Sequence, residues 1–508
     1  VVLRVPPPVY APMAVPVRKK PARALGVRHE ICKAEATGEG KAAAAAAGRR
    51  ARCVLWDLSI PAPKWAPPPV RKGVLPAGHC AAVELQLARA LGGLRKRFAA
   101  LCKDHGLKAR PRRLTFERWR FAAKLEEAAT CPRGHAVLPT TGRGRSGADA
   151  ALAEELQLQG LAADDAQAVA AALRKEAGRA CATMVKLRNQ VISGKQLKSP
   201  TVYVSFHRHS VDMRCSETFV KIGRTAYGKL SLLHRLHAPP GEAAEAALTA
   251  GETMAAGEAE EAEAAAAQEA CGGAGAEADA ANGPRGKLHL RMFSLLLRYK
   301  YLGGHGFQAA LGPAVWALLR DRLGVGLECF ASPLNAYIPH FCSGFEDVDA
   351  PFGSRGSFFG LRPLSGSFAA NPPFVHPIMD EMAERILALL EAAKDKHALA
   401  FAVFVPSWRE GKAFHRLGAS TLLRRTVLVA VADHGYCDGA SHQRKDPFRE
   451  SPYDTVCFFL QTDRAAQKWP VDSKFEAELR TAMAQCVPST TAVRRQRRKR
   501  KRMDAETS

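Results

Sequence analysis

The sequence lacks any run of about 18 apolar residues, so it predicts no transmembrane helix. Residues 1–26 also lack the apolar block and the small-residue cleavage site of a secretory signal, whereas an organellar leader rich in Arg and Ala stays open. We therefore expect no membrane contact.

The 13 cysteines are scattered and never form a CxxC pair, which favours a reducing compartment and argues against a disulfide framework. His29 with Cys32 and Cys131 with His135 have metal-like spacings, but neither has a second pair at the distance of a zinc finger. The sequence therefore predicts no metal site.

Negative charge is also scarce. The chain has 74 Lys and Arg against 49 Asp and Glu, a formal net charge of +25. The run Arg494–Arg502 contributes +8, while residues 241–283 contain nine Glu, one Asp and no Lys or Arg. The remaining sequence is strongly basic, which favours a polyanionic partner such as RNA or DNA; a basic solvated surface without such a partner is the alternative.

Composition divides the chain into six segments. They are a disordered Pro- and Ala-rich N-terminus (1–75), a helical domain (76–198), a strand-containing segment that joins the core (199–237), an acidic low-complexity insertion (238–286), an α/β core (287–480) and a basic tail (481–508). Within the first segment, Cys53–Trp65 is apolar enough to dock on a folded body.

The apolar patterns predict the elements of these segments. Three- and four-residue spacing predicts helices between 77 and 195, and β-branched and aromatic residues predict a strand over 201–213. In the core, we expect a helix over 375–396 and strands over 326–334, 398–406, 426–432 and 455–461. Strands that alternate with helices predict an α/β sheet covered on both faces.

In such sheets, ligands bind beyond the carboxyl ends of the strands. The segments 331–335 and 406–410 follow predicted strands, and "NPPF" (371–374) lies between a short segment and a helix. Pro suits the first turn of a helix, so "NPPF" can be an ordinary turn. It can also hold an adenine: the Asn371 oxygen and the Pro372 carbonyl can accept from both amine hydrogens, Pro373 stiffens the turn, and Phe374 offers a face for stacking. Amino-methyltransferases that use S-adenosyl-L-methionine share this turn.

A longer resemblance includes this turn. The stretch 328–382, "ECFASPLN…NPPFVHPIMDEM", is similar to the core of the phosphorylated-CTD-interacting factor family, the cap-specific adenosine N(6)-methyltransferases, as are "SPTVYVSF", "RYKYLGGHGFQAALG" and "FVPSWRE". The resemblance implies a Rossmann-like methyltransferase core with an N-terminal helical domain. It also implies S-adenosyl-L-methionine as donor and 7-methylguanosine-capped RNA as substrate, methylated at the 6-amino group of the cap-adjacent 2′-O-methyladenosine.

The resemblance also implies roles for individual residues. Asn371, Pro372, Pro373 and Phe374 would form the adenine and methyl-donor site. Further candidates are Glu328 for the donor, Trp408, Arg409, Glu410 and Asp433 for the capped RNA, and Arg118 and Arg120 for phosphates or, alternatively, as a solvated helix face. His376 stands where the family leads us to expect a polar or acidic residue, so we expect substrate contacts there to differ.

The chain departs from the family at its N-terminus. A WW module needs two Trp about twenty residues apart, but Trp56 and Trp65 are nine apart, so we expect no such module and regard docking to the polymerase tail as doubtful. The basic tail predicts nuclear import, with nonspecific RNA contact as the alternative. Alternative functions are methylation of DNA adenine, internal RNA adenosine or protein glutamine, and RNA binding without catalysis.

Overall fold

The computed structural model describes residues 56, 73–112, 114–128, 135–141, 146–239, 242, 277–278, 283–302, 309–439, 441–443 and 446–488. The predicted disordered N-terminus, acidic insertion and basic tail lie largely outside these residues. Within the described residues, no helix is both long and apolar enough to span a bilayer.

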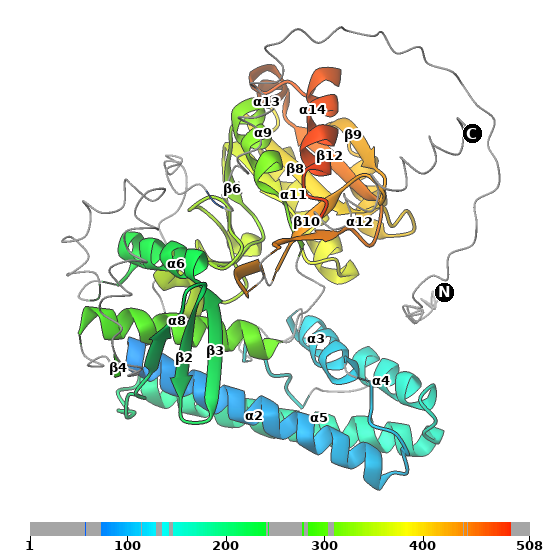
Figure 1. Cartoon of the computed structure of the whole chain (residues 1–508). Coiled ribbons are helices and arrows are strands. Elements are labelled where there is room, and N and C mark those ends of the chain that lie inside the picture. Colours follow the sequence, from blue (N-terminus) through cyan, green and yellow to red (C-terminus); the bar gives the residue numbers. More distant parts are fainter. Residues whose placement is uncertain are drawn as a thin grey trace, which may run out of the picture. The chain divides into compact units, whose positions relative to one another are not determined.

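Four helices form the first part of the described chain, and α2 and α5 run side by side (Figure 1). Their apolar residues recur at helical spacing, as Leu87, Leu91, Leu94 and Phe98 do on α2, and these side chains are buried. A short connection separates α4 from α5, where Gly160 adopts a φ of +100° that favours glycine. The helices are α2 (Ala77–Asp104), α3 (Thr115–Ala128), α4 (Gly147–Gln157) and α5 (Ala163–Ile192).

The predicted strand over 201–213 forms two antiparallel strands in a small sheet of order β3-β2-β1-β4. This sheet shares one hydrophobic core with the four helices and with α8, which packs along α2. The division into domains at 199 and 287 stays a prediction. The elements are β1 (Tyr203–Phe206), β2 (Ser210–Cys215), β3 (Thr218–Gly223), α6 (Arg224–His237), β4 (Glu277–Ala278) and α8 (Pro284–Leu302).

A five-stranded mixed sheet of order β6-β7-β8-β12-β9 forms the second part. β6, β7 and β8 are parallel, and β12 runs antiparallel to both β8 and β9, so β9 points in the same direction as β8. All residues of β8 and β12 are buried, as expected for central strands. The strands are β6 (Val325–Glu328), β7 (Gly366–Ala370), β8 (Leu399–Pro406), β9 (Leu423–Val429) and β12 (Thr455–Gln461).

Helices cover both faces of this sheet, which confirms the predicted α/β arrangement. α11 and α12 pack on one face, and α9 and α14 on the other, each with its own hydrophobic core. The helices are α9 (Pro313–Leu323), α11 (His376–Ala393), α12 (Lys412–Gly418), α13 (Asp463–Lys468) and α14 (Ser473–Ala484). The predicted helix over 375–396 is therefore α11.

Two predicted strands differ from those observed. The strand predicted over 326–334 ends at Glu328, where the chain leaves the sheet for a long connection with only short helical turns. The strand predicted over 426–432 is β9, which begins and ends three residues earlier. β9 is an edge strand whose alternate side chains are exposed, and these include the charged Arg424, which lies before the apolar run.

The connection from β6 to β7 contains α10 (Glu346–Asp349) and the 3-10 turns η2 (Ala350–Phe352) and η3 (Phe358–Gly360). A second small sheet, of order β11-β10-β5, is formed by β5 (Ala309–Ala310), β10 (Gly435–Asp438) and β11 (Phe448–Glu450), with the 3-10 turn η4 (Ser441–Gln443) before β11.

Candidate functional site

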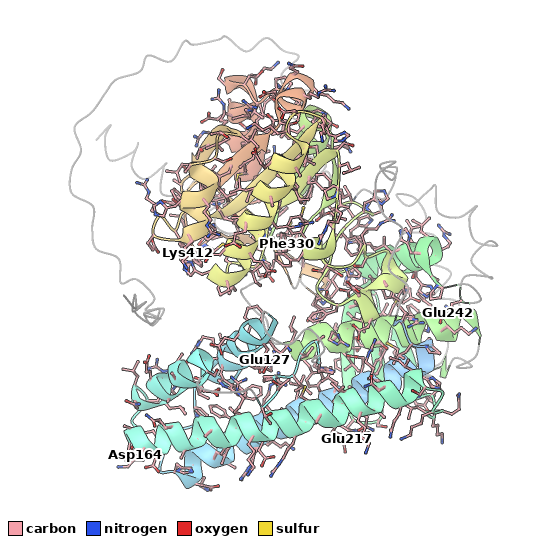
Figure 2. The ribbon with its side chains drawn as sticks, turned by 180° about the vertical axis from the view of Figure 1, so that it is seen from behind. Glu127, Asp164, Glu217, Glu242, Phe330 and Lys412 are labelled. Carbon is pink, nitrogen blue, oxygen red and sulfur yellow. The ribbon has the colours of Figure 1, made fainter. Side chains whose placement is uncertain are left out.

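The predicted site segments meet at one edge of the mixed sheet. Parallel pairing places the ends of β6, β7 and β8 at this edge, where Glu328 lies beside Ala369. Thr455, the first residue of β12, pairs with both Pro406 and Val429, so β8 and β9 end there too. Figure 2 shows Phe330 and Lys412, which follow β6 and β8, at the same end of the sheet. The edge is therefore a site position, as expected for this class of sheet.

Asn371 follows β7 directly and has only half of its amide satisfied. Its Nδ2 donates a hydrogen bond to the carbonyl of Ala309 in β5, which fixes the orientation of the amide. Its Oδ1 is buried and has no hydrogen-bond partner among the described residues. A buried acceptor without a partner is rare, because losing water without a replacement costs about 1–3 kcal/mol. The oxygen is thus placed to accept a hydrogen bond from a ligand.

The two prolines give this turn a second acceptor. Val375 N donates to the carbonyl of Pro373 at 2.7 Å, which closes the turn before α11. In the described part of the chain, no hydrogen bond reaches the carbonyl of the preceding Pro372. Proline fixes its own φ, which stiffens the turn, and it has no backbone N–H that could bond to a nearby carbonyl. Both features favour a stiff turn in which the Pro372 carbonyl is available.

Phe374 packs into the hydrophobic core rather than standing clear of it. Its ring is 7% exposed and lies edge-on to Tyr436, with ring centroids 5.9 Å apart. Tyr436 Oη and Thr455 Oγ1 are 2.6 Å apart, and His434 Nε2 lies 2.7 Å from the same Oγ1. These contacts fix Tyr436, which in turn supports Phe374 and the turn. Stacking of a base on Phe374 stays a prediction.

His434 is part of this support. Its Nδ1 lies 2.8 Å from the carbonyl of Ala430, so both ring nitrogens are engaged by the protein. Burial lowers the pKa of His434 below its usual value, because the charged imidazolium loses its hydration. The ring is therefore neutral near pH 7 and serves the scaffold.

Trp408 lies at the end of β8, between two other rings. Its indole is half-buried, 4.6 Å from the His376 ring with an interplanar angle of 32°, and 5.3 Å from Tyr453 at 80°. A turn closed by Gly411 N donating to Trp408 O at 2.9 Å leaves Arg409 and Glu410 exposed beside it. The structure thus brings together an aromatic cluster, a cation and a carboxylate, which are side chains that can contact a base and phosphates.

Glu328 is engaged by the protein itself. Its Oε1 accepts from Tyr337 N at 2.5 Å and Ile338 N at 2.8 Å. Lys229 of α6 donates to the carbonyl of Ala336 at 2.6 Å and attracts the carboxylate. Burial raises the pKa of Glu328 and lowers the pKa of Lys229. The two side chains hold the segment after β6, and a contact of Glu328 with the donor stays a prediction.

Lys229 also meets the predicted docking island of the N-terminus. Its Nζ lies 5.5 Å from the centroid of the half-buried Trp56 ring, a cation–π contact. Trp56 is the one residue of that island within the described ranges, and its contact agrees with docking at this point.

The two arginines proposed for phosphates differ. Arg118 is exposed and forms an ion pair with Glu155 on α4. Arg120 is 2% exposed and donates to the carbonyls of Val137 and Leu302, so the interpretation as a solvated helix face is wrong for it. A phosphate could reach Arg120 only if these hydrogen bonds opened. The burial of Arg120 therefore does not support the predicted contact between Arg120 and a phosphate.

Asp433 is exposed in the turn after β9, at the same edge as Trp408. Neither the patterns nor the resemblance gave Tyr453 or Ala309 a role in the site, although Ala309 lies within the family-like stretch "RYKYLGGHGFQAALG". Tyr453 lies just before the predicted strand 455–461. Had the sequence shown that this strand runs antiparallel to its neighbours, Tyr453 would have been expected at this edge. Ala309 lies 62 residues from Asn371 in sequence, and its two-residue strand gives no signal. In the described ranges no group of three or more His, Cys, Asp or Glu could hold a metal.

Comparisons with known proteins match this part of the chain. Residues 276–439 match the family model described as "Phosphorylated CTD interacting factor 1 WW domain". The chain is 36% identical over 206 residues to the proteins named "mRNA (2'-O-methyladenosine-N(6)-)-methyltransferase" of Homo sapiens and Mus musculus. Each match covers 40% of this chain and 29% of the relative's length. Over this region, the resemblance predicted from the motifs is confirmed.

The matched segment is not itself a small WW module. Its described residues form α8, α9, α11 and most of the mixed sheet, and its two tryptophans, Trp316 and Trp408, lie far apart in sequence. The predicted absence of a WW module near the N-terminus depends on Trp65, which lies outside the described residues.

Proposed function

We propose that this chain transfers a methyl group from S-adenosyl-L-methionine to the 6-amino group of the 2′-O-methyladenosine next to the 7-methylguanosine cap of mRNA. The names of the human and mouse relatives support this substrate. The match covers less than a third of each relative, so the structure of the site must support the chemistry separately.

The observation that carries the proposal is the buried Oδ1 of Asn371, which has no hydrogen-bond partner among the residues that the structure describes. The exocyclic amine of adenine is a weak nucleophile, because its lone pair is delocalised into the ring. An acceptor at each N–H lets the nitrogen become pyramidal as it attacks. The Asn371 oxygen and the Pro372 carbonyl are two such acceptors on one stiff turn.

These acceptors lower the barrier because they are held in place before the substrate binds. Nδ2 of Asn371 is anchored to Ala309, so the amide need not reorient during the reaction. S-adenosyl-L-methionine, when bound, supplies an electrophilic methyl group on a sulfonium. The residues of this chain orient the amine toward it, so positioning and electrostatics account for the rate.

The aromatic cluster at the end of β8 fits the other part of the substrate. Trp408 offers an indole face to a base, Arg409 a cation to the cap phosphates, and Glu410 an acceptor to guanine amines. His376 contacts Trp408, so it shapes the same surface. Asp433 lies at this edge as well and is proposed as a further contact to the capped RNA.

We propose a Rossmann-like fold for the methyltransferase core as part of the same function. Four strands in one direction, β6, β7, β8 and β9, with the antiparallel β12 between β8 and β9, are compatible with a Rossmann-like methyltransferase core beside an N-terminal helical domain. We also propose a nuclear location, on the sequence of the basic tail alone.

The test uses the full chain with S-adenosyl-L-methionine and RNAs of one sequence. One RNA carries the cap and a first 2′-O-methyladenosine, and the second has no cap. A third RNA, the matched control, is capped but begins with guanosine. Mass spectrometry of the first nucleotide should find the methyl group on the capped adenosine RNA at least about tenfold faster than on the uncapped RNA, since a lost recognition contact of about 1.4 kcal/mol lowers the rate about tenfold. The first guanosine of the control has no 6-amino group and should receive no methyl group.

Equal rates on capped and uncapped RNA would reject the cap as part of the substrate, and a methyl group found only at other positions would favour an internal RNA adenosine. Transfer to DNA adenine or to protein glutamine alone would reject RNA as the substrate. No transfer to any of these, together with no binding of S-adenosyl-L-methionine in calorimetry, would leave an RNA-binding protein without catalysis.

A further inference from the structure

One exposed face of α2, with the loop that follows it, carries a dense set of cations. Their side chains take part in no ion pair or hydrogen bond within the described part of the chain, unlike the neighbouring Arg95, which pairs with Glu117. We call these residues the α2 basic face: Arg89, Lys96, Arg97, Lys103, Lys108, Arg110 and Arg112.

The spacing puts these charges in a row. Arg89, Lys96 and Lys103 are seven residues apart and lie on one side of the helix, about 10 Å from one another along its axis. The exposed Gly93 stands between the first two, so no bulky side chain interrupts the row. The row extends over about 21 Å and then continues into the loop.

Few carboxylates neutralise this face. Asp104 is the one acidic residue between positions 89 and 112, and it is exposed near the end of the row. On the neighbouring α5, Asp165 is bound to His105 at 2.8 Å. Between positions 89 and 112, the cations of the face therefore far outnumber the carboxylates.

The chemistry of the face fits a nucleic-acid backbone. A row of point charges on a rigid helix matches a chain of regularly spaced phosphates, which release their counterions on binding. No exposed aromatic residue lies between positions 89 and 112, since Phe98 is buried in the core. Without a ring for stacking, contacts to the phosphates dominate, and such contact depends little on sequence.

We propose that the α2 basic face binds the sugar–phosphate backbone of single-stranded RNA, independently of its sequence and of a cap. This binding is separate from the methyl-transfer site, and it lies in a part of the chain, 89–112, outside the matched family region. It would add to the affinity for long transcripts and make that affinity strongly dependent on salt.

The test measures binding of the full chain to an uncapped oligouridine of about 20 nucleotides by fluorescence anisotropy at several salt concentrations. The variant is Arg89→Gln, Lys96→Gln, Lys103→Gln. The matched control, Lys175→Gln, Lys186→Gln, Lys198→Gln, removes the same charge from exposed residues on and after α5. Circular dichroism checks that both variants fold.

The α2 variant should reduce the slope of log affinity against log salt by about 2, because each single-strand contact contributes about 0.7. Its dissociation constant should rise at least about tenfold at low salt, while the control keeps a slope close to that of the original chain. An unchanged slope in the α2 variant, or equal losses in both variants, would overturn the proposal.

A second probe tests the kind of partner. A multiply phosphorylated serine peptide of the same net charge replaces the RNA under the same conditions. We expect weaker binding of this peptide than of the RNA by the original chain. If the α2 substitutions abolish peptide binding but leave RNA binding unchanged, the face is a phosphoprotein site and the proposal is wrong.

Discussion

The ends of β6 and β7 lie side by side in one sheet, yet their polar residues are in opposite states. Glu328 at the end of β6 accepts hydrogen bonds from two backbone amides and is attracted by Lys229. Asn371 after β7 has its amide nitrogen anchored, and its oxygen is buried without a partner in the described part of the chain. The carboxylate thus supports the fold, while the amide oxygen is available to a ligand.

We propose that this difference distinguishes a site residue from a scaffold residue in such a sheet. Position alone does not, because both residues stand at the carboxyl ends of parallel strands. Residue type does not distinguish them either, since a buried carboxylate such as Glu328 is a more usual candidate for catalysis than an amide. The two residues differ in whether their side-chain oxygen already accepts a hydrogen bond from the protein. Substitutions at both positions test this difference.

The largest effect is expected from Asn371→Ala. It removes one of the two proposed acceptors, and losing one preorganised hydrogen bond in a transition state costs about 100- to 1,000-fold in kcat. Asn371→Asp keeps an acceptor oxygen but places a second oxygen against the Ala309 carbonyl, so it should retain part of the rate. Steady-state methylation of capped RNA measures both. A rate for Asn371→Ala within tenfold of the original chain would contradict the assigned role.

Glu328→Ala should act on stability. It leaves the amides of Tyr337 and Ile338 without their acceptor and Lys229 without its counter-charge, at a cost of about 3 kcal/mol in unfolding free energy. Glu328→Gln keeps an acceptor at the same position and should cost about 1 kcal/mol or less. Thermal unfolding compares the two. Equal midpoints for the alanine variant and the original chain would show that Glu328 does not hold this segment.

Trp408→Ala should weaken RNA binding without destroying catalysis. A base stacked on an aromatic ring contributes about 1–3 kcal/mol, so the KM for capped RNA should rise about tenfold or more while kcat changes less. Trp408→Phe keeps a ring between His376 and Tyr453 and serves as the control. If the phenylalanine variant loses as much as the alanine variant, the indole has a structural role instead.

The smallest effect is expected at His434, below the turn. The pKa of His434 is lower in the folded chain than in the unfolded chain. As the pH falls below the usual pKa of histidine, the unfolded chain therefore binds more protons than the folded chain. Its contribution to stability is therefore present above about pH 6.5 and is lost as the pH falls below that value. His434→Gln should flatten this part of the profile of unfolding midpoint against pH. A profile as steep as that of the original chain would assign the dependence to other groups.

The sequence predicted the central strands and their helices well for a physical reason. The strands at 399–406 and 455–461 are buried on both faces, so their apolar runs are continuous and their limits are clear. The strand at 325–328 was predicted too long, because an apolar run does not show where the backbone leaves the sheet. There, the chain forms isolated bridges between Glu328, Phe341 and Ser354 instead.

The position of the candidate turn in the fold was predictable, but the state of its hydrogen bonds was not. The turn at 371–374 was located from its residues, and its place at a strand end follows from the alternation of strands and helices. That the Asn371 amide is half satisfied depends on Ala309, a contact across 62 residues that local patterns cannot reveal. The burial of Arg120 likewise depends on carbonyls far along the chain, such as that of Leu302.

The most direct test compares the two strand ends in one experiment. Single-turnover methyl transfer to capped RNA is measured for Asn371→Ala and Glu328→Gln, at a temperature where circular dichroism shows both to be folded. We expect a loss of about 100-fold or more for the first variant and less than about tenfold for the second, since only the first removes an acceptor from the reacting amine. Equal losses, or a larger loss for Glu328→Gln, would contradict the assignment of the amine acceptor to the end of β7.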